Sequence, residues 1–355
     1  MPRSLSKWVL RASLLAGGLA LACATERGLE PKPVRYNIYA NENHTGNIYV
    51  IDADSLTVVD SIPGMGYVDN MVASADGRYL FAQLWATRTV KIDVLTKSIV
   101  ASYPDDTFSN LFLLNEGRLL IRERCQLEHI DPATFRITFV DSTRICEVTG
   151  APHGTRVVGS RPDQSRLLVY DSGKEKMVAD FEARTLEGTP VAVYCAALHP
   201  DGRRVLVLGR ESYDRTVFLV VDVATESTLF QYPLAMPFGE IGISPDGTRA
   251  LVTDPGQPEF DQTVGTLDVF YLDELKHVVR FNRFWGYTQA VHRIRFLPNT
   301  TIAVIAPYWK SPGHLWTLNW RTLLPEGRVW EQGYESFGDV AVGLCPEQQA
   351  ACARH

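Results

Sequence analysis

The chain has 355 residues, of which 45% are hydrophobic and 21% are charged. This is the composition of an ordinary globular protein, and the length is enough to bury a large core. The formal net charge is −6 and is not concentrated in a tail. The charge argues against a nucleic-acid partner, because proteins that bind nucleic acids usually present a basic face.

The N-terminus has the pattern of an export signal. Three basic residues precede an apolar run at 12–22 that is too short to span a bilayer as a mature helix. The segment 19–23, Leu-Ala-Leu-Ala-Cys, resembles a bacterial lipobox, although Ala20 stands where Leu is usual. The resemblance implies a lipid on Cys23, which would become the mature N-terminus. The alternative is an ordinary cleaved signal with an incidental cysteine.

Residues 23–34 contain two prolines and no hydrophobic periodicity, which is typical of a short tether. We therefore expect the protein in the bacterial cell envelope, facing the periplasm or the cell surface. Its contact with the membrane is expected through the N-terminal lipid.

From residue 46 onward a β-hairpin recurs along the chain. Its first copy has two strands rich in β-branched residues, at 46–52 and 56–62, joined by a turn of Asp, Ala and Ser. The copies recur about every 40–50 residues, which is the length of a four-stranded propeller blade. The residues that end the first strand of each copy are Asp52, Asp93, Asp131, Asp171, Asp222, Asp273 and Asn319.

A second kind of hairpin lies between these copies, with two apolar strands around a tight turn shaped by Pro and Gly. The turns lie at 74–78, 115–118, 199–203 and 244–248, with weaker versions at 152–154 and 297–299. Strands such as 205–208 and 217–221 are apolar on both alternating faces, which is typical of a sheet covered on both sides. The sequence therefore predicts an all-β domain at 35–344 made of seven four-stranded antiparallel blades in a propeller.

The ends of this domain indicate how the ring closes. The strand at 36–41 directly precedes the opening hairpin, so the first blade has no inner strand before it. A spare strand follows the seventh hairpin at 337–344. We expect this C-terminal strand to complete the first blade, because closure leaves no sheet edge bare. Four segments result: a signal peptide at 1–22, a tether at 23–34, the propeller at 35–344 and a tail at 345–355.

These units resemble the YVTN-type β-propeller repeat, which is a WD40-like repeat. The units that carry the resemblance lie at 37–41, 47–52, 57–62, 74–81, 196–222 and 241–253. The resemblance covers residues 35–344 and is clearest in the first, second, fifth and sixth blades. It implies the propeller fold and says little about chemistry, because one fold serves many functions.

Beyond the lipobox cysteine, five cysteines remain. In an oxidising compartment we favour two bridges, Cys125 to Cys146, which flank one hairpin, and Cys345 to Cys352, which bracket a short loop. The fifth, Cys195, is expected to be buried in the strand at 191–198. Unpaired buried thiols are the alternative.

The long connections of such a propeller converge on one face, and variable loops on a rigid scaffold usually carry binding. Two of these loops are rich in aromatic and cationic residues, which suit a protein, peptide or glycan partner from the envelope. The alternative is that the aromatic side chains pack between blades. The candidate binding residues are Trp285, Tyr287, His292, Tyr308, Trp309, Lys310, His314, Arg210 and Asp254.

No catalytic motif is found in the sequence, and Ser244 lies in only a partial nucleophile-elbow pattern. Charged residues at strand ends, such as Glu123, Arg161 and His292, are of the types that lactonase-like propellers use at their channel, but none has metal-ligand spacing. We therefore predict a binding or scaffold protein that is not an enzyme and has no cofactor or metal. The alternative is a hydrolase or a periplasmic redox-associated protein that uses the mouth of the central channel.

Overall fold

A computed structural model describes the ranges 34–42, 45–85, 87–104, 110–113, 119–123, 125–141, 144–150, 154–161, 163–212, 215–234, 239–254, 266–281, 291–307, 314–330 and 337–346. The chain divides into two units between Val34 and Arg35, and the second unit is the subject here. The expected signal peptide, most of the tether and nearly all of the tail lie outside the described residues. Within those ranges, no helix has the length and apolar character needed to cross a bilayer.

The described part of the second unit forms seven four-stranded antiparallel sheets, here called the first to the seventh blade. From the inner to the outer strand, the first four blades are β28 (Phe337–Leu344), β1 (Tyr36–Glu42), β2 (Asn47–Asp52), β3 (Thr57–Ile62); β4 (Val68–Ala73), β5 (Tyr79–Leu84), β6 (Arg88–Asp93), β7 (Ser98–Pro104); β8 (Asn110–Leu113), β9 (Leu119–Glu123), β10 (Gln126–Asp131), β11 (Arg136–Asp141); and β12 (Cys146–Gly150), β13 (Arg156–Ser160), β14 (Leu167–Asp171), β15 (Lys176–Phe181).

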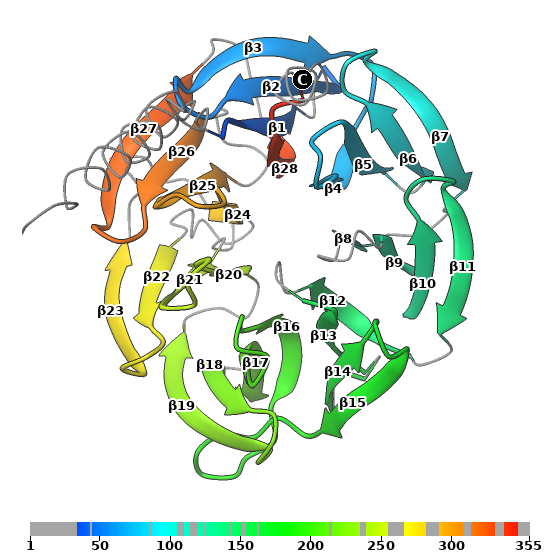
Figure 1. Cartoon of the computed structure of the whole chain (residues 1–355). Helices are drawn as coiled ribbons and strands as arrows, with labels where there is room; N and C mark the ends of the chain where they lie inside the picture. The colour runs from blue at the N-terminus through cyan, green and yellow to red at the C-terminus, as the bar shows by residue number, and fades with distance from the viewer. Residues whose placement is uncertain are drawn as a thin grey trace, which may run out of the picture. The chain divides into compact units, whose positions relative to one another are not determined.

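The fifth to seventh blades follow the same order. Their strands are β16 (Ala192–Leu198), β17 (Arg204–Ser212), β18 (Arg215–Asp222), β19 (Ser227–Leu234); β20 (Ile241–Ile243), β21 (Arg249–Asp254), β22 (Thr266–Tyr271), β23 (Lys276–Phe281); and β24 (Val291–Phe296), β25 (Ile302–Pro307), β26 (His314–Asn319), β27 (Leu324–Trp330). The predicted all-β propeller with seven blades is therefore confirmed (Figure 1).

The ring closes through the C-terminal strand, as the sequence predicted. Each inner strand contacts the next around the ring, from β28 through β4, β8, β12, β16, β20 and β24 back to β28. β28 pairs antiparallel with β1, with Ile38 opposite Val342. The pairing extends past the strands, because the Cys345 N–H donates to the Arg35 carbonyl oxygen at 3.0 Å.

The two faces of the ring are named here by their connections. Because each blade is an antiparallel meander, the turns after its first and third strands lie at one end of the sheet. In the second blade these are the turns at 74–78 and 94–97, and this side of the ring is called the short-turn face. The opposite side, called the long-loop face, carries the turn between β5 and β6 and the link at 63–67.

The core lies between the blades, because each sheet packs on two others. In the fifth blade Leu206 and Val207 point to opposite faces of β17, and both are fully buried. Phe218 of this blade stacks on Phe270 of the sixth at a ring-centroid distance of 4.3 Å. Burying a side chain of this size contributes roughly 1.5–3 kcal/mol, and the repeated contact explains the continuous apolar runs in the sequence.

The recurring Asp has a local structural role. The Asp222 Oδ1 accepts the N–H groups of Ala224 and Thr225 at 2.9 and 3.0 Å, which fixes the turn into the outer strand. The residue directly after this Thr has a left-handed backbone, and every blade repeats this feature. The left-handed residues are Leu56, Lys97, Phe135, Glu175, Glu226, Leu275 and Leu323.

This regularity corrects one assignment made from the sequence. In the other blades the recurring residue lies four positions before the left-handed one, and in the sixth blade that residue is Tyr271. Tyr271 pairs with Lys276 as Asp222 pairs with Ser227. Asp273 is therefore not the sixth copy. A tyrosine side chain does not accept two backbone N–H groups, so this copy lacks the marker by which the sequence was aligned.

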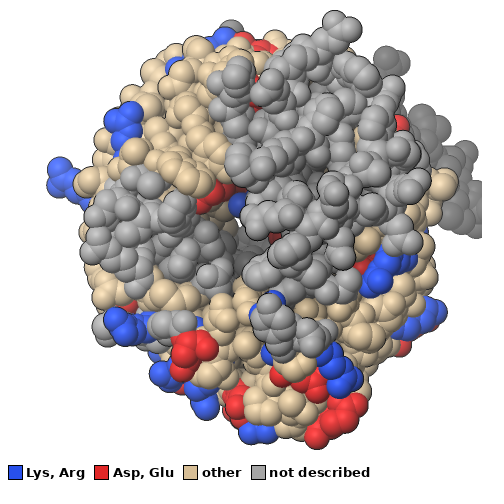
Figure 2. All heavy atoms as spheres, turned by 180° about the vertical axis from the view of Figure 1, so that it is seen from behind, with Lys and Arg blue, Asp and Glu red and all other residues tan. Residues whose placement is uncertain are grey.

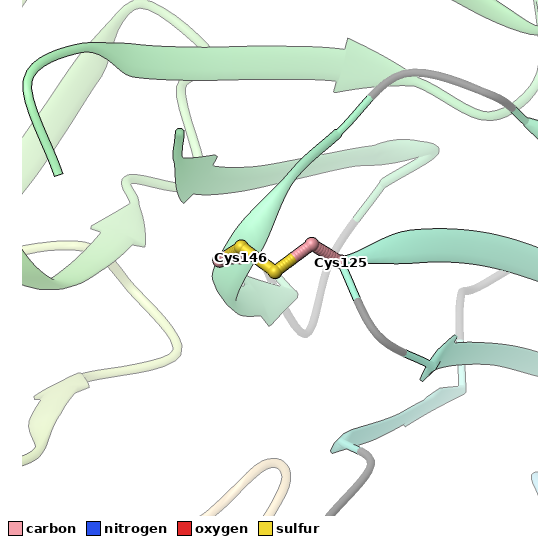
Figure 3. The surroundings of a disulfide bond; sticks show 2 residues. All are labelled: Cys125 and Cys146. Carbon is pink, nitrogen blue, oxygen red and sulfur yellow. A yellow bond between two sulfur atoms is a disulfide. The ribbon is translucent and has the colours of Figure 1, made fainter. Parts of the chain in front are cut away.

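A disulfide joins Cys125 and Cys146, the first of the two pairs favoured from the sequence (Figure 3). It links the third and fourth blades on the long-loop face. The bond closes a loop with a sequence separation of 21, for which chain entropy predicts a stabilisation of about 3 kcal/mol. Cys352 lies outside the described residues, and Cys195 is half-buried rather than buried as expected, because it lies at the edge of the core between the fifth and sixth blades.

A substitution at Gly77 would test the closure of the ring, because this residue packs against the closing strand β28. Gly77 has a φ of +69°, and a Cβ there would lie 1.9 Å from the carbonyl oxygen of Leu344 in the closing strand. Gly64 has a φ of +74° with nothing within 4 Å of its Cβ position. We expect Gly64→Ala to cost about 1–2 kcal/mol from backbone strain, and Gly77→Ala to cost roughly 1–3 kcal/mol more from displacing β28. Urea unfolding measures both costs. Equal losses of stability in the two variants would contradict the close contact between Gly77 and Leu344.

Asp201 should make stability depend on acid pH. Burial raises its pKa, but the N–H groups of Arg203 and Arg204 and the Arg204 guanidinium outweigh burial and lower the pKa to about 2. A carboxyl group with a lowered folded-state pKa stabilises the protein above its ordinary pKa of 3.8, and this contribution is lost as the pH falls towards 2.

We therefore expect Asp201→Asn to destabilise the protein by roughly 1–2 kcal/mol at pH 7, after allowance for solvent screening. The difference in stability between the variant and the wild type should shrink between pH 4 and pH 2. Thermal unfolding monitored by circular dichroism measures it. Asp273→Asn, at a turn position that forms no such bonds, is the matched control. A difference that stays constant with pH would disprove the assignment.

Candidate functional site

The inner strands are irregular near the long-loop face. In β4 the register shifts between Val68 and Asn70, and in β24 it shifts between Val291 and Arg293. β16 and the pairing of β28 with β1 have comparable shifts. An extra residue of this kind is a β-bulge, which redirects neighbouring side chains and is frequent beside functional sites. His292, one of the predicted site residues, is the bulge residue of β24.

Polar side chains towards the long-loop ends of the inner strands connect successive blades. Three of them accept the backbone N–H of a residue in the inner strand of the following blade, at distances of 2.6, 3.1 and 2.8 Å. The bonded pairs, in the same order, are Asp339 with Met71, Asn70 with Leu111, and Glu240 with Ile294. The long-loop end of the channel is thus held together by polar side chains as well as by apolar packing.

Four charged residues gather at this end on three consecutive inner-strand segments, and we call them the arginine cluster: Glu240, Arg293, Arg295 and Asp339. Arg295 Nη1 donates to Glu240 on the preceding blade, and its Nη2 donates to Asp339 Oδ1 on the following blade at 3.2 Å. Arg293 Nε lies 3.2 Å from the same Oδ1, as an ion pair without an aligned hydrogen bond. One fully buried carboxylate therefore serves two guanidinium groups.

The charges of the cluster are balanced but not equally buried. The side chain of Asp339 is 0% exposed, whereas those of Arg293 and Arg295 are 23% and 25% exposed. Burial raises the pKa of Asp339 above its ordinary value, against the opposing effect of the two guanidinium groups. Burial lowers the pKa of Arg295, but the charges of Glu240 and Asp339 outweigh it and raise that pKa. Arg295 therefore stays charged.

This arrangement is suited to binding an anion. A guanidinium has five N–H donors in a fixed plane, and the carboxylates occupy only some of them. Because Arg295 is held from both sides, its remaining donors are oriented before any ligand arrives. Among the described side chains that Figure 2 shows, acidic and basic ones are mixed.

The predicted site residues lie outside this cluster or outside the description. Trp285, Tyr287, Tyr308, Trp309 and Lys310 are not among the described residues. His292, His314 and Asp254 are described at the level of the backbone, at the long-loop ends of β24, β26 and β21.

Two arginines named in the sequence analysis, one for the binding face and one for the channel, have other contacts. The Arg210 guanidinium in β17 lies 5.4 Å from the ring centre of Tyr194, the bulge residue of β16. Arg161 forms an ion pair with Asp180 of the outer strand β15, which directs it away from the channel. Among the side chains that the structure describes, no three His, Cys, Asp or Glu residues are close enough to hold a metal ion.

The arginine cluster was not found from the sequence. Its signal is the pattern Val-His-Arg-Ile-Arg-Phe at 291–296, in which basic residues alternate with apolar ones in an inner strand. The carboxylate partners are distant along the chain, so a spacing rule does not reveal them. Knowledge of which strands are neighbours in the ring is needed to bring Glu240, Arg295 and Asp339 together.

Comparisons with known proteins show the fold. No protein family matches the sequence, and no curated protein does. Among solved structures, the chain is similar to Kuenenia stuttgartiensis Hydrazine Synthase, with a TM-score of 0.57 and 11% identity over 71% of this chain and 76% of the other. It is also similar to Dihydro-heme d1 dehydrogenase NirN in complex with DHE, with a TM-score of 0.56 and 14% identity over 88% and 75%. At these identities the likeness extends to the propeller fold.

These findings correct the expectation that the chain is not an enzyme. Both similar structures are enzymes by name, a synthase and a dehydrogenase. That expectation rested on the lack of a short catalytic motif, and in a propeller the functional side chains come from separate blades. A motif search along the chain does not detect such a site, as the arginine cluster illustrates.

Asp339 is expected to be the most sensitive member of the cluster. Asp339→Asn keeps an acceptor for the Met71 N–H but leaves two guanidinium groups without their carboxylate, so we expect a loss of about 3–5 kcal/mol in urea unfolding. Asp180→Asn is the matched control, because Asp180 also pairs with two arginines but is 30% exposed. It should cost under about 1 kcal/mol. Similar losses for the two variants would show that burial does not set the strength of the cluster.

Proposed function

We propose that this propeller is an enzyme, or the substrate-binding subunit of an oxidoreductase assembly, and that it works at the long-loop end of its central channel. The observation that carries the proposal is the arginine cluster, in which Arg293 and Arg295 are each about a quarter exposed and are held by the buried Asp339. The oxidoreductase class is supported by the similar propeller that is named a dehydrogenase. The substrate would carry a carboxylate or another anionic group.

The role of the cluster follows from its geometry. Arg295 is fixed between Glu240 and Asp339, so little side-chain entropy is lost when it binds a ligand. Charge-assisted hydrogen bonds from a guanidinium to a carboxylate are about twice as strong as neutral ones. The two arginines would orient the substrate, and the partly buried site would strengthen their attraction to it. We assign them to substrate positioning and not to bond making.

The proposal includes the cellular address that the sequence suggested. The protein would be an exported lipoprotein with a lipid on Cys23 and a propeller of the YVTN repeat type, in the periplasm or at the cell surface. The disulfide between Cys125 and Cys146 supports export, because such bonds persist in oxidising compartments. A partner in the envelope would complete the oxidoreductase assembly.

Native mass spectrometry of the full-length protein, extracted with detergent from bacterial envelopes, tests the site. We expect the wild type to retain an acidic small molecule, and Arg293→Gln and Arg295→Gln to lose at least 90% of it because each removes a charged donor. Arg321→Gln is the matched control, because Arg321 belongs to the same blade but lies in a turn on the short-turn face.

Two results would contradict the proposal. Equal retention by the wild type and by both cluster variants would place the ligand elsewhere. Fractionation tests the address: Cys23→Ser should release the protein into the soluble exported fraction, and continued extraction only with detergent would rule out the lipid at this cysteine.

A further inference from the structure

A groove of about 490 Å³ opens on the long-loop face between the first and second blades. One wall is the link between β3 and β4, with Met65 and Tyr67, and the other is the end of β5 and the start of β6, with Leu84, Trp85 and Arg88. None of these residues belongs to the arginine cluster, so the groove is a separate feature of the face.

The backbone around the groove is held in place by hydrogen bonds. The amide nitrogen of Asn41, which is fully buried, donates to the Gly66 carbonyl oxygen at 3.0 Å, and its Oδ1 accepts the Val68 N–H at 3.0 Å. The two walls are joined directly, because the Trp85 N–H donates to the Tyr67 carbonyl oxygen at 2.9 Å. The groove is therefore formed before any ligand binds, which reduces the entropy lost on binding.

A glycine contact keeps this arrangement close-packed. Gly46 accepts the N–H groups of Met65 and Gly66 at 2.8 and 3.0 Å. A Cβ at Gly46 would lie 2.7 Å from the Gly66 Cα. The link can therefore lie against the first blade only because residue 46 has no side chain.

The groove has an apolar floor and a cationic rim. Met65 and Leu84 are buried, whereas Trp85 is 48% exposed although it is large and apolar. Tyr67 meets Trp85 edge to face at a centroid distance of 4.6 Å. Arg88 is exposed, and within the described part of the chain no carboxylate forms an ion pair with it. An exposed tryptophan beside an unpaired arginine is the combination found at binding hot spots.

The side chains in the walls of the groove limit which classes of ligand it could bind. A sugar would need several polar side chains for its hydroxyl groups, but the lining of the groove is mainly apolar and aromatic. Its polar groups are the Tyr67 hydroxyl, the Trp85 indole N–H, the Arg88 guanidinium and the Thr87 hydroxyl, which already donates to the Leu84 carbonyl oxygen at 3.3 Å. A small molecule is usually enclosed on most sides, whereas Trp85 leaves this groove open. An apolar side chain on the floor with a neighbouring carboxylate at Arg88 matches both the hydrophobic and the charged part of the surface.

We propose that this groove is the docking site for an extended segment of a partner protein in which a bulky apolar side chain is followed by Asp or Glu. The apolar side chain lies against Trp85 over the floor formed by Met65 and Leu84, and the carboxylate binds the Arg88 guanidinium. This inference does not depend on the proposed function, because it uses none of the residues of the arginine cluster.

The test uses the full-length protein labelled with 5-fluorotryptophan and the peptide acetyl-Leu-Phe-Asp-Gly-amide as the probe. The chain has seven tryptophans, and the ¹⁹F signal of Trp85 is assigned by its absence in Trp85→Phe. We expect the peptide to shift this signal with a saturable dependence on concentration, and the peptide with Asn in place of Asp to bind at least threefold more weakly.

Variants separate the two halves of the site. Arg88→Gln should remove the preference for the Asp peptide over the Asn peptide, because the preference arises from the charge pair. Lys97→Gln, an exposed cation of the same blade on the short-turn face, is the matched control and should keep the preference. Trp85→Ala should weaken binding of the Asp peptide at least tenfold. Isothermal titration calorimetry measures this affinity, because the variant lacks the Trp85 signal. Unchanged unfolding midpoints would show that the variants remain folded.

Three results would overturn the proposal. The first is the lack of a saturable shift with the wild type, and the second is equal affinity for the Asp and Asn peptides. The third is binding of phenylacetate as tight as that of the peptide, which would assign the groove to small aromatic carboxylates.

Discussion

The pairing of β28 with β1 is the constraint on which the rest of the structure depends. It joins the last strand of the chain to the first and so gives the first blade the four strands that the other blades have. The same strand supplies Asp339, the buried carboxylate that fixes Arg293 and Arg295. Closure of the fold and assembly of the candidate site are therefore one event. A chain that has not yet closed keeps the strands of Arg295 and Glu240 but lacks the carboxylate of Asp339.

The arginine cluster shows how a rigid ring can hold charges that water would otherwise screen. Burying Asp339 alone would be costly, and two guanidinium groups and the Met71 N–H compensate for this cost. Breaking such a pair leaves an uncompensated charge, whereas the intact pair contributes little net stability. The cluster is therefore better explained by a role in recognition than by a role in stability.

The fold was predictable from the sequence because its information is local and repeated. Each Asp turn, such as the one at Asp222, is formed by hydrogen bonds to residues two and three positions later, so it leaves a mark in the sequence. In the sixth blade Tyr271 replaces the recurring Asp. The sequence alignment of the repeats therefore chose Asp273, two residues too late, although it still found the strand. The half-burial of Cys195 was not predictable, because it depends on the neighbouring blade.

The candidate sites were less predictable, for a physical reason. Arg295 and Asp339 meet because their strands are neighbours around the channel, and no rule of sequence spacing expresses that proximity. The groove beside Trp85 likewise depends on two loops that meet at a hydrogen bond from one backbone to the other. The aromatic loops that attracted attention in the sequence lie outside the described residues and stay predictions. The sequence shows which residues carry charged or aromatic groups, but it does not show which of them are brought together from different blades.

The hydrogen bond between Cys345 and Arg35 places the two ends of the ring side by side on the short-turn face. A short peptide linker between them would make the backbone continuous, and new ends could then be opened in any turn of that face. Such circular permutants would keep every blade and would separate the order of synthesis from the order of packing. Each blade could thus be made the one that combines strands from both ends of the chain, so the position of ring closure could be chosen by the experimenter.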